Sequence, residues 1–445
     1  MQDNISSNIN SKFSEMVVNI TNSSIDKLHA FVEQHLPPKK LESKMFGEVF
    51  TPLSLVDEML TAVEKYGNKN IWKNPNIKIL DPAAGIGNFP LIAYKKLMKG
   101  LEHIPKYKDD ECRRKHILEN MLYMVELNPT NVRLMRRIFG SKKYKLNIVK
   151  GDFFNKKTTD TLLTLLKANE LKFDVVMGNP PFNDGSGNKG KGHTLWTVFL
   201  ETALKSLLKE EAFLAFITPS LWRQADHELF TLMKSKQLLY LEIHDVKDGL
   251  SMFKSSTRYD WYIVRNSKAK AKTVLKDEDG KEYKNIHLKD WAFLPNSKYS
   301  EINNLIARGS EERCNILHSE SDYEPRQKWM SNVQTTEFKY PCIYSINVDN
   351  KTSLKYSSII TRGHFGIPKV IFSNGMGTII DTNGKYGLTQ WASGIVDDKR
   401  NLQGIYNCLT NPKFKEIILA INLSSDAINW RIMKYFKKDF WKYYN

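Results

Sequence analysis

The sequence predicts an α/β protein with a doubly wound, mostly parallel sheet, followed by a C-terminal α+β domain. Between residues 46 and 265, short apolar runs alternate with stretches of helical periodicity, which is the pattern of consecutive βαβ units. Near Pro295 the periodicity changes, and beyond residue 301 the chain is rich in Gly, Asn, aromatic residues and Lys, with short strands and turns before helices after Asn401. We therefore expect a helical N-terminal extension over 1–44, an α/β domain over 45–300 and a separate domain over 301–445.

Composition points to an anionic partner. The 445 residues include 66 Lys and Arg against 49 Asp and Glu, which gives a formal net charge of +17. An excess of positive charge favours a polyanion, above all nucleic acid. Compositional drift in an AT-rich genome is the alternative, since Lys, Asn and Ile are all abundant, so the charge only supports other evidence.

Several classes of protein are disfavoured. No apolar run approaches the roughly 20 residues of a membrane span, and the polar N-terminus lacks the apolar core of a secretory signal. The four cysteines, at positions 112, 314, 342 and 408, form no Cys-x-x-Cys pair. That spacing argues against zinc or any other metal site and against a disulfide framework, and it fits a reducing cytoplasm. We expect a cytoplasmic protein without membrane contact.

The individual elements follow from local patterns. Apolar residues at near-helical spacing between Ile20 and Val32, ended by Pro37-Pro38, predict a helix in the N-terminal extension. Asp279-Gly280 between alternating residues predicts a β-hairpin over 272–286. The apolar runs that predict parallel strands are Ile77–Leu80, Leu122–Val125, Leu146–Val149, Phe173–Val176 and Phe213–Ile217.

The first predicted strand ends in a loop suited to ligand binding. It reads Asp81-Pro82-Ala83-Ala84-Gly85-Ile86-Gly87-Asn88. Gly85 and Gly87 let the backbone turn tightly and approach a ligand closely at the start of a helix. Asp81 at the strand end can accept a positively charged amino group. A dinucleotide fingerprint needs a third Gly, where this chain has Pro90, so NAD chemistry is disfavoured.

Two further strand ends carry acidic residues. Glu126 ends the second strand, where a carboxylate is placed to hold ribose hydroxyls. Asp152 and Phe153 follow the third strand, where the carboxylate can accept from an amino group and the ring can pack on a base. Taken singly, Glu126 also fits a solvated carboxylate and Asp152 a helix cap. As an ordered series, these strand ends indicate a nucleoside-binding edge.

The fourth strand leads into Asn179-Pro180-Pro181-Phe182, which is the most informative motif of the chain. Two prolines make a rigid loop, because they fix φ and remove two backbone donors. The Asn179 oxygen and the carbonyl between Asn179 and Pro180 can each accept one hydrogen of a ring-bound amine, while Phe182 stacks on the ring. A purely structural turn is the alternative.

These motifs together resemble the S-adenosylmethionine-dependent N6-adenine DNA methyltransferases, in the γ order, in which the cofactor motifs precede the catalytic motif. The resemblance covers about residues 46–222 and includes Val49-Phe50-Thr51-Pro52 before the first strand, His193–Trp196, and Phe216–Trp222. Ala84 departs from the Cys of many members, and Ile86 stands for a small residue. The residues it implies at the cofactor are Thr51, Pro52, Asp81, Pro82, Ala83, Gly85, Gly87, Asn88, Glu126, Asp152, Phe153 and Asn179, with Asn179, Pro180, Pro181 and Phe182 as the catalytic motif.

The resemblance implies a Rossmann-like catalytic core, S-adenosyl-L-methionine as the cofactor and double-stranded DNA as the substrate. It further implies methylation of a flipped-out adenine within a specific sequence, a DNA target-recognition domain over 301–445, and a cognate restriction endonuclease acting on the same site. We expect a monomer or weak dimer. Candidate DNA contacts, each also compatible with a solvated or structural role, are Arg326, Lys328, Arg362, His364 and Lys369.

Alternative functions stay open at this point. The same loop suits an RNA base or a protein glutamine amide, and a non-catalytic DNA-binding subunit with a methyltransferase-like core would share the fold. The intact Asp81, Gly85, Gly87 and Asn179 argue against the non-catalytic subunit. No acidic-plus-Lys nuclease motif is evident near the N-terminus, so we expect no DNA cleavage. The Gly- and Lys-rich segment 184–192 is expected to be either a phosphate-contacting loop or a linker.

Overall fold

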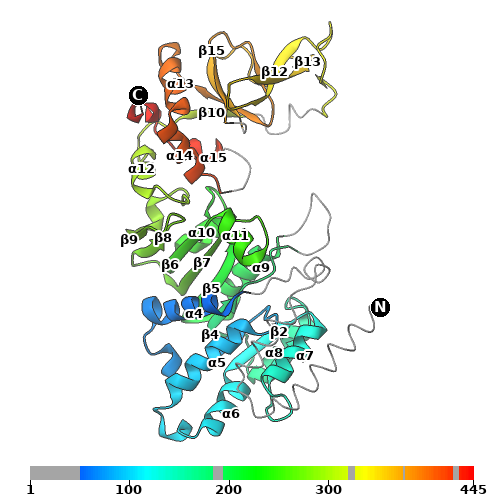
Figure 1. The fold of residues 1–445 in the computed structure, drawn as a ribbon, viewed down its shortest axis with the longest axis vertical. Coiled ribbons are helices and arrows are strands. Elements are labelled where there is room, and N and C mark those ends of the chain that lie inside the picture. Colours follow the sequence, from blue (N-terminus) through cyan, green and yellow to red (C-terminus); the bar gives the residue numbers. More distant parts are fainter. Residues whose placement is uncertain (1–50, 184–193, 319–325, 374–375, 424–429, 445) are drawn as a thin grey trace.

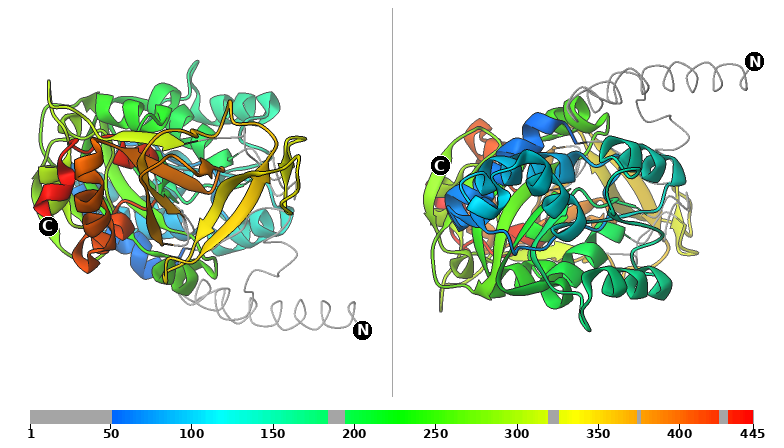
Figure 2. Two further views of the ribbon diagram at one scale, coloured as in Figure 1. Left: turned by 90° about the horizontal axis from the view of Figure 1, so that it is seen from above. Right: turned by 90° about the horizontal axis from the view of Figure 1, so that it is seen from below.

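A computed structural model describes residues 51–183, 194–318, 326–373, 376–423 and 430–444. The described chain is elongated, with the C-terminal sheets at one end of its long axis and helices α5 and α6 at the other (Figure 1). In the views along that axis, the C-terminal sheets overlap the rest of the described chain (Figure 2). The expected N-terminal helix and the segment 184–192 lie outside the described residues.

A nine-stranded sheet forms the centre of the larger part. Its strand order is β3-β2-β1-β4-β5-β7-β6-β8-β9. The strands from β3 to β5 are all parallel, whereas β7 runs antiparallel between β5 and β6. The bounds are β1 Ile79–Asp81, β2 Leu122–Glu126, β3 Asn147–Lys150, β4 Phe173–Gly178, β5 Leu208–Pro219, β6 Lys236–His244, β7 Tyr259–Lys268, β8 Thr273–Lys276 and β9 Glu282–Ile286.

Helices cover both faces of this sheet, as a doubly wound fold requires. Neighbouring strand residues alternate between the two hydrophobic cores: Ile79 and Val175 pack on one face, and Leu80 and Val176 pack on the other. On the first face lie α4 Leu53–Ala62, α5 Asn88–Leu101, α6 Asp110–Asn120 and α7 Pro129–Ile138. The second face carries α8 Lys156–Leu166, α9 Leu195–Thr202 and α10 Glu228–Ser235.

The predicted α/β fold is confirmed, strand by strand, for the five apolar runs. The predicted hairpin is also present, because β8 and β9 pair in antiparallel fashion. It has a role that its sequence did not indicate: β8 pairs with β6 in parallel, so the hairpin extends the central sheet. Helix α11 Val246–Phe253 lies between β6 and β7.

The C-terminal part contains two four-stranded sheets, ordered β10-β17-β14-β15 and β11-β13-β12-β16. Helix α12 Tyr299–Leu305 crosses the predicted boundary at residue 300, and its buried Tyr299 and Ile302 share one core with the second face of the central sheet. The boundary therefore stays a prediction. The remaining bounds are β10 Asn315–His318, β11 Met330–Ser331, β12 Tyr340–Ile346, β13 Thr352–Ser357, β14 Lys369–Ser373, β15 Thr378–Asp381, β16 Gly387–Leu388, β17 Ala392–Val396, α13 Leu402–Thr410, α14 Pro412–Ala420 and α15 Trp430–Met433.

Membrane-spanning length is not reached by any helix in the described ranges.

Close packing of α5 gives a test of the fold. A Cβ at Gly100 would lie 2.1 Å from the backbone oxygen of Trp72. Alanine favours a helix over glycine by about 1 kcal/mol, but a clash with backbone is not relieved by a side-chain rotation. We expect Gly100→Ala to lower the free energy of unfolding by about 1–3 kcal/mol. Urea unfolding measures this, and the exposed neighbour Lys99→Ala should stay within about 0.5 kcal/mol of wild type. Equal values for both variants would contradict the packing described.

Candidate active site

The predicted site residues gather at the carboxyl edge of the parallel strands. Asp81 ends β1, Glu126 ends β2, and Asn179 follows β4, and these three strands are direct neighbours in the order β2-β1-β4. The parallel register pairs Asp81 with Met124, two residues before Glu126. Open α/β sheets bind ligands at this edge. The fold therefore brings together residues that are about 100 positions apart in the sequence.

Glu126 holds the loops after β1 and β2 together. One carboxylate oxygen accepts from the Gly85 amide at 2.7 Å, and the other accepts from the Asn128 amide at 2.7 Å. The Ala84 amide donates to the Val125 carbonyl at 2.9 Å. These bonds fix the Gly-containing loop against the neighbouring strand. Each carboxylate oxygen has a second lone pair, which can accept from a ribose hydroxyl.

Glycine is required at Gly87, which precedes helix α5. Its φ of +94° is one that L side chains rarely adopt, and a Cβ there would lie 3.0 Å from the Phe139 ring. Gly85 also has a positive φ, of +56°. The loop thus carries no side chain at Gly85 and Gly87, and a ligand can approach its backbone closely there.

Asp81 is a buried carboxyl group without a cation. It is 1% exposed, and its Oδ1 accepts from the Ala83 amide at 3.1 Å. Within the described part of the chain, no Lys or Arg forms an ion pair with it. Burial raises the pKa of Asp81 well above its usual value, and the charge of Glu126 raises this pKa further. Gly178, with φ +152°, lies against it, since a Cβ there would sit 2.9 Å from Oδ1. A bound ammonium group is the partner that this site lacks.

The Asn179 amide is oriented by Thr51. Asn179 Nδ2 donates to Thr51 Oγ1 at 3.2 Å, and Asn88 Nδ2 donates to the Thr51 carbonyl at 2.7 Å. Asn179 Oδ1 is buried and has no hydrogen-bond partner among the described residues. Buried polar atoms nearly always have a partner, so an exception calls for an explanation. An incoming N–H donor would supply the missing bond.

Phe182 is half-buried and packs edge-on against Phe253, with 6.5 Å between ring centroids. Phe253 ends helix α11 and in turn packs on Tyr259 at 4.8 Å. The contact between Phe182 and Phe253 was not foreseen from the sequence, because the two residues are 71 positions apart along the chain. The aromatic support fixes the ring plane of Phe182 beside the Asn-Pro-Pro loop.

The loop after β3 presents a different ring from the one expected. Phe153 is 4% exposed and packs in the core against Phe199, whereas Phe154 is 39% exposed. Asp152 Oδ1 accepts from the Phe154 amide at 3.0 Å. The cofactor role of Asp152 and Phe153 stays a prediction. Leu127, directly after Glu126, is 51% exposed. The sequence analysis did not single it out, although an apolar residue next to a strand-end carboxylate was the signal that could have done so.

In the C-terminal part, Lys369 is not available to DNA. Its side chain is fully buried, with Nζ 3.1 Å from Asp381 Oδ2 and bonded to the carbonyls of His364 and Ile367. The structural alternative considered for this residue is therefore the correct one. Arg362 is exposed, and its guanidinium lies 5.3 Å from the Trp329 ring centroid.

The residues at this edge fit S-adenosylmethionine. S-adenosylmethionine would place the ammonium group of its methionine part at the buried Asp81 carboxylate and its ribose hydroxyls at Glu126, and these residue roles stay predictions. In the described ranges, no group of His, Cys, Asp and Glu could hold a metal ion.

Comparison with known proteins finds relatives among the adenine-specific DNA methylases. The model of the N-6 DNA methylase family matches residues 29–221. An adenine-specific methylase of Mycoplasma pneumoniae is 24% identical over 50% of this chain and 70% of its own length. The modification methylase CviBIII of Paramecium bursaria Chlorella virus NC1A is 24% identical over 67% of this chain and 73% of its own length. These matches confirm the resemblance to N6-adenine DNA methyltransferases, and the family match supports S-adenosylmethionine as the cofactor.

Among solved structures, the ATP-dependent Type ISP restriction-modification enzyme LlaBIII bound to DNA is similar over 90% of this chain, with a TM-score of 0.52 and 11% identity. At this identity the likeness is one of fold, and it extends into the C-terminal part. The match covers 40% of the length of LlaBIII and about half of the length of two modification subunits.

Replacing Asp81 should affect protein stability and cofactor binding in different directions. A carboxyl group whose pKa is raised in the folded state makes the folded protein less stable as pH rises from the unfolded pKa, about 3.9, to the raised pKa. We expect Asp81→Asn to unfold at the same or higher urea concentration than wild type at pH 7. Its affinity for S-adenosylmethionine should fall at least tenfold, because the ammonium loses a charged partner.

Calorimetry of cofactor binding and urea unfolding between pH 5 and 8 provide the test. Exposed Asp160→Asn is the control and should change neither quantity. An Asp81→Asn protein that binds the cofactor as tightly as wild type would remove Asp81 from the site.

Proposed function

We propose that this protein transfers the methyl group of S-adenosylmethionine to the N6 amino group of an adenine flipped out of duplex DNA. The observation that supports the proposal most is the buried, unpartnered Asn179 Oδ1, whose amide nitrogen is occupied by Thr51. A ring-bound amine has two hydrogens to donate. Asn179 Oδ1 accepts one of them, and the carbonyl between Asn179 and Pro180 accepts the other.

Those two hydrogen bonds address the main obstacle to the reaction. The lone pair of an amine conjugated to a ring is delocalised, so the nitrogen is a poor nucleophile. Acceptors on both hydrogens draw the nitrogen toward tetrahedral geometry and free the lone pair. S-adenosylmethionine supplies an electrophilic methyl group on a sulfonium centre. Holding the amine in line with that methyl group accounts for much of the remaining rate enhancement.

Base flipping is part of the proposal. The N6 amine is engaged in a base pair, and Asn179 Oδ1 is buried below the surface, so the nucleotide has to leave the helix to reach it. Phe182, braced by Phe253, then stacks on the extruded base. The net charge of +17 favours the phosphate backbone.

Sequence-specific modification is part of the proposal. The two C-terminal sheets, with exposed Arg362 beside Trp329, form the part that selects the DNA sequence. The curated relatives and solved neighbours include modification enzymes, which favours a role in restriction–modification. An RNA base or a glutamine amide as the acceptor is the alternative, favoured only by the planar amine or amide that either would present to the same loop.

Asn179 provides the first test. Asn179→Ala should lower the rate of methyl transfer to DNA by at least a thousandfold, since it removes one of the two acceptors proposed for the amine hydrogens. Cofactor affinity should stay within about threefold of wild type, because the proposal assigns the Asn179 side chain to the target base rather than to the cofactor. Tritium transfer from labelled cofactor to DNA and calorimetry measure the two quantities. Activity within tenfold of wild type would contradict the assignment of Asn179 to the target base.

Thr51 gives a second, finer test. Thr51→Val keeps the shape of the side chain but removes the acceptor for Asn179 Nδ2, so the amide can turn and present its nitrogen to the substrate. We expect kcat to fall about tenfold, with KM for DNA little changed. Thr51→Ser keeps the hydroxyl and should retain most activity. If both variants lose activity equally, the hydroxyl bond does not orient Asn179.

A further inference from the structure

Arg223 lies in an unusual position for a charged residue. It is fully buried on the turn Ser220–Arg223, directly after β5, the strand that pairs with β4 beside the catalytic loop. Its Nε donates to Asp260 Oδ2 at 2.8 Å, and both side chains are 0% exposed. Asp260 Oδ1 accepts from Ser220 Oγ at 2.9 Å. The Arg223–Asp260 ion pair is therefore fully enclosed by protein at the carboxyl edge of the parallel strands.

The remaining donors of Arg223 reach toward the C-terminal part. Nη1 donates to the carbonyls of Leu294 and Pro295, each at 2.9 Å, and Nη2 donates to Asn296 Oδ1 at 2.8 Å. The Leu294 amide donates back to the Arg223 carbonyl at 3.1 Å. One guanidinium thus fixes three consecutive residues of the segment that leads out of the central sheet.

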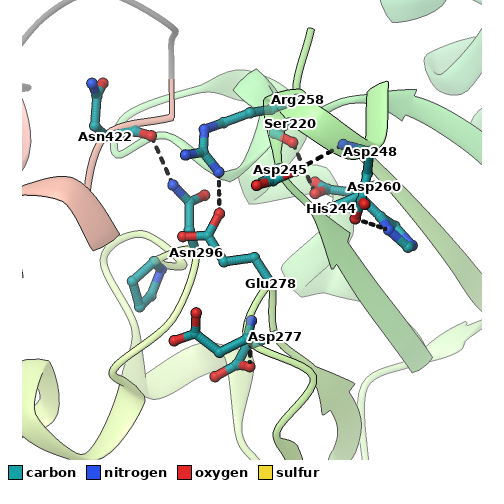
Figure 3. Close-up of polar contacts among 12 residues, drawn as sticks. Ser220, His244, Asp245, Asp248, Arg258, Asp260, Asp277, Glu278, Asn296 and Asn422 are labelled. Carbon is teal, nitrogen blue, oxygen red and sulfur yellow. Dashed lines mark hydrogen bonds and ion pairs between the residues drawn. The ribbon is translucent and has the colours of Figure 1, made fainter. Parts of the chain in front are cut away.

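Asn296 continues this connection into the C-terminal helices. Its amide donates to the Ala420 carbonyl at 2.6 Å, and its Nδ2 donates to the Asn422 carbonyl at 2.7 Å. Figure 3 shows Asn296 meeting Asn422 beside the Arg258–Glu278 ion pair, with Ser220 pointing toward Asp260. The chain of bonds runs from Asp260 on β7, through Arg223 and Asn296, to the end of α14.

Such a connection is poorly explained by stability alone. Replacing a buried ion pair with well-packed apolar residues is often neutral or stabilising, because desolvation offsets the attraction. Apolar packing has no preferred direction, whereas the planar guanidinium makes directed bonds in a fixed fork. The feature that Arg223 adds is therefore a defined angle between the catalytic edge and the C-terminal helices.

We infer that Arg223 is a positioning residue for methyl transfer. It holds the C-terminal part at one angle to the catalytic edge, so that the adenine delivered to Asn179 lies at a fixed distance from the DNA sequence bound by the C-terminal sheets. This inference rests on the proposed function. Weakening the connection should loosen the choice of adenine and leave the cofactor site, on strands β1 to β4, intact.

Two substitutions, the junction variants Arg223→Lys and Asn296→Asp, interrupt this chain of hydrogen bonds at different points. Arg223→Lys keeps the charge for Asp260 but lacks the fork that reaches residues 294–296. Asn296→Asp keeps an acceptor for Arg223 but has no donor for the Asn422 carbonyl. This second variant still tests the inference if Arg223→Lys does not fold. Arg113→Lys is the matched control: Arg113 is 6% exposed and bonds to the Tyr107 carbonyl at 2.7 Å and to Asp110, all within one part of the molecule.

The first readout does not depend on activity. Spin labels on Glu102→Cys and Lys351→Cys, in a Cys112→Ser background, report the distance between the two parts, and the three other cysteines are buried. Arg223→Lys and Asn296→Asp should at least double the width of the distance distribution, while Arg113→Lys leaves it unchanged. Unchanged widths in both junction variants, or equal broadening in Arg113→Lys, would overturn the inference.

The second readout concerns the choice of adenine. The methylated site is first mapped by sequencing modified DNA, and rates are then compared with a duplex in which the adenine is displaced by one base pair. The preference for the original position should fall at least tenfold in the junction variants, with cofactor affinity within twofold of wild type. A preserved preference would overturn the inference. Absence of adenine methylation by the wild type would instead overturn the proposed function, and the label distances would still decide whether Arg223 sets the angle.

Discussion

The hydrogen bond from Asn179 Nδ2 to Thr51 Oγ1 is the interaction on which the active-site arrangement depends. It joins residues 128 positions apart and decides which end of the amide faces the substrate. Thr51 is itself fixed, because its carbonyl accepts from Asn88 at the start of α5. The segment before α4, the glycine loop after β1 and the catalytic loop after β4 therefore act as one hydrogen-bonded unit. Within the part of the chain that the structure describes, the Asn179 oxygen is left without a hydrogen-bond partner.

The same edge of the sheet contains a second unfulfilled group, the Asp81 carboxyl. Its burial and the nearby Glu126 both raise its pKa, so the folded protein carries a group that is less stable when charged. Such groups persist where function requires them, at the expense of stability. In the described ranges, Asp81 forms no ion pair and Asn179 Oδ1 accepts no hydrogen bond. The proposed reaction would bring a cofactor ammonium to the first and an adenine amine to the second.

Much of this edge could be predicted from the sequence because the determinants are local. Apolar runs followed by Asp81, Glu126 or Asn179 defined strand ends, and the parallel order of βαβ units implied that those ends meet. Local sequence does not determine which way a ring faces. Phe153 lies in the core while Phe154 is exposed, although both are phenylalanines in the same loop. Lys369 pairs with Asp381 inside a sheet, and Arg223 bonds to carbonyls about 70 residues away. Such pairings depend on tertiary contacts that no spacing rule contains.

The central claim is that the acceptor is the adenine N6 amine of duplex DNA. The most direct test incubates the purified protein and labelled S-adenosylmethionine with duplex DNA, RNA and a glutamine-containing peptide library, followed by mass spectrometry of the digested nucleosides and peptides. We expect N6-methyldeoxyadenosine from the duplex, none of it with Asn179→Ala, and no methylated product from RNA or peptide. Methylated RNA bases or glutamine, or an unmodified duplex under conditions where calorimetry detects cofactor binding, would contradict it.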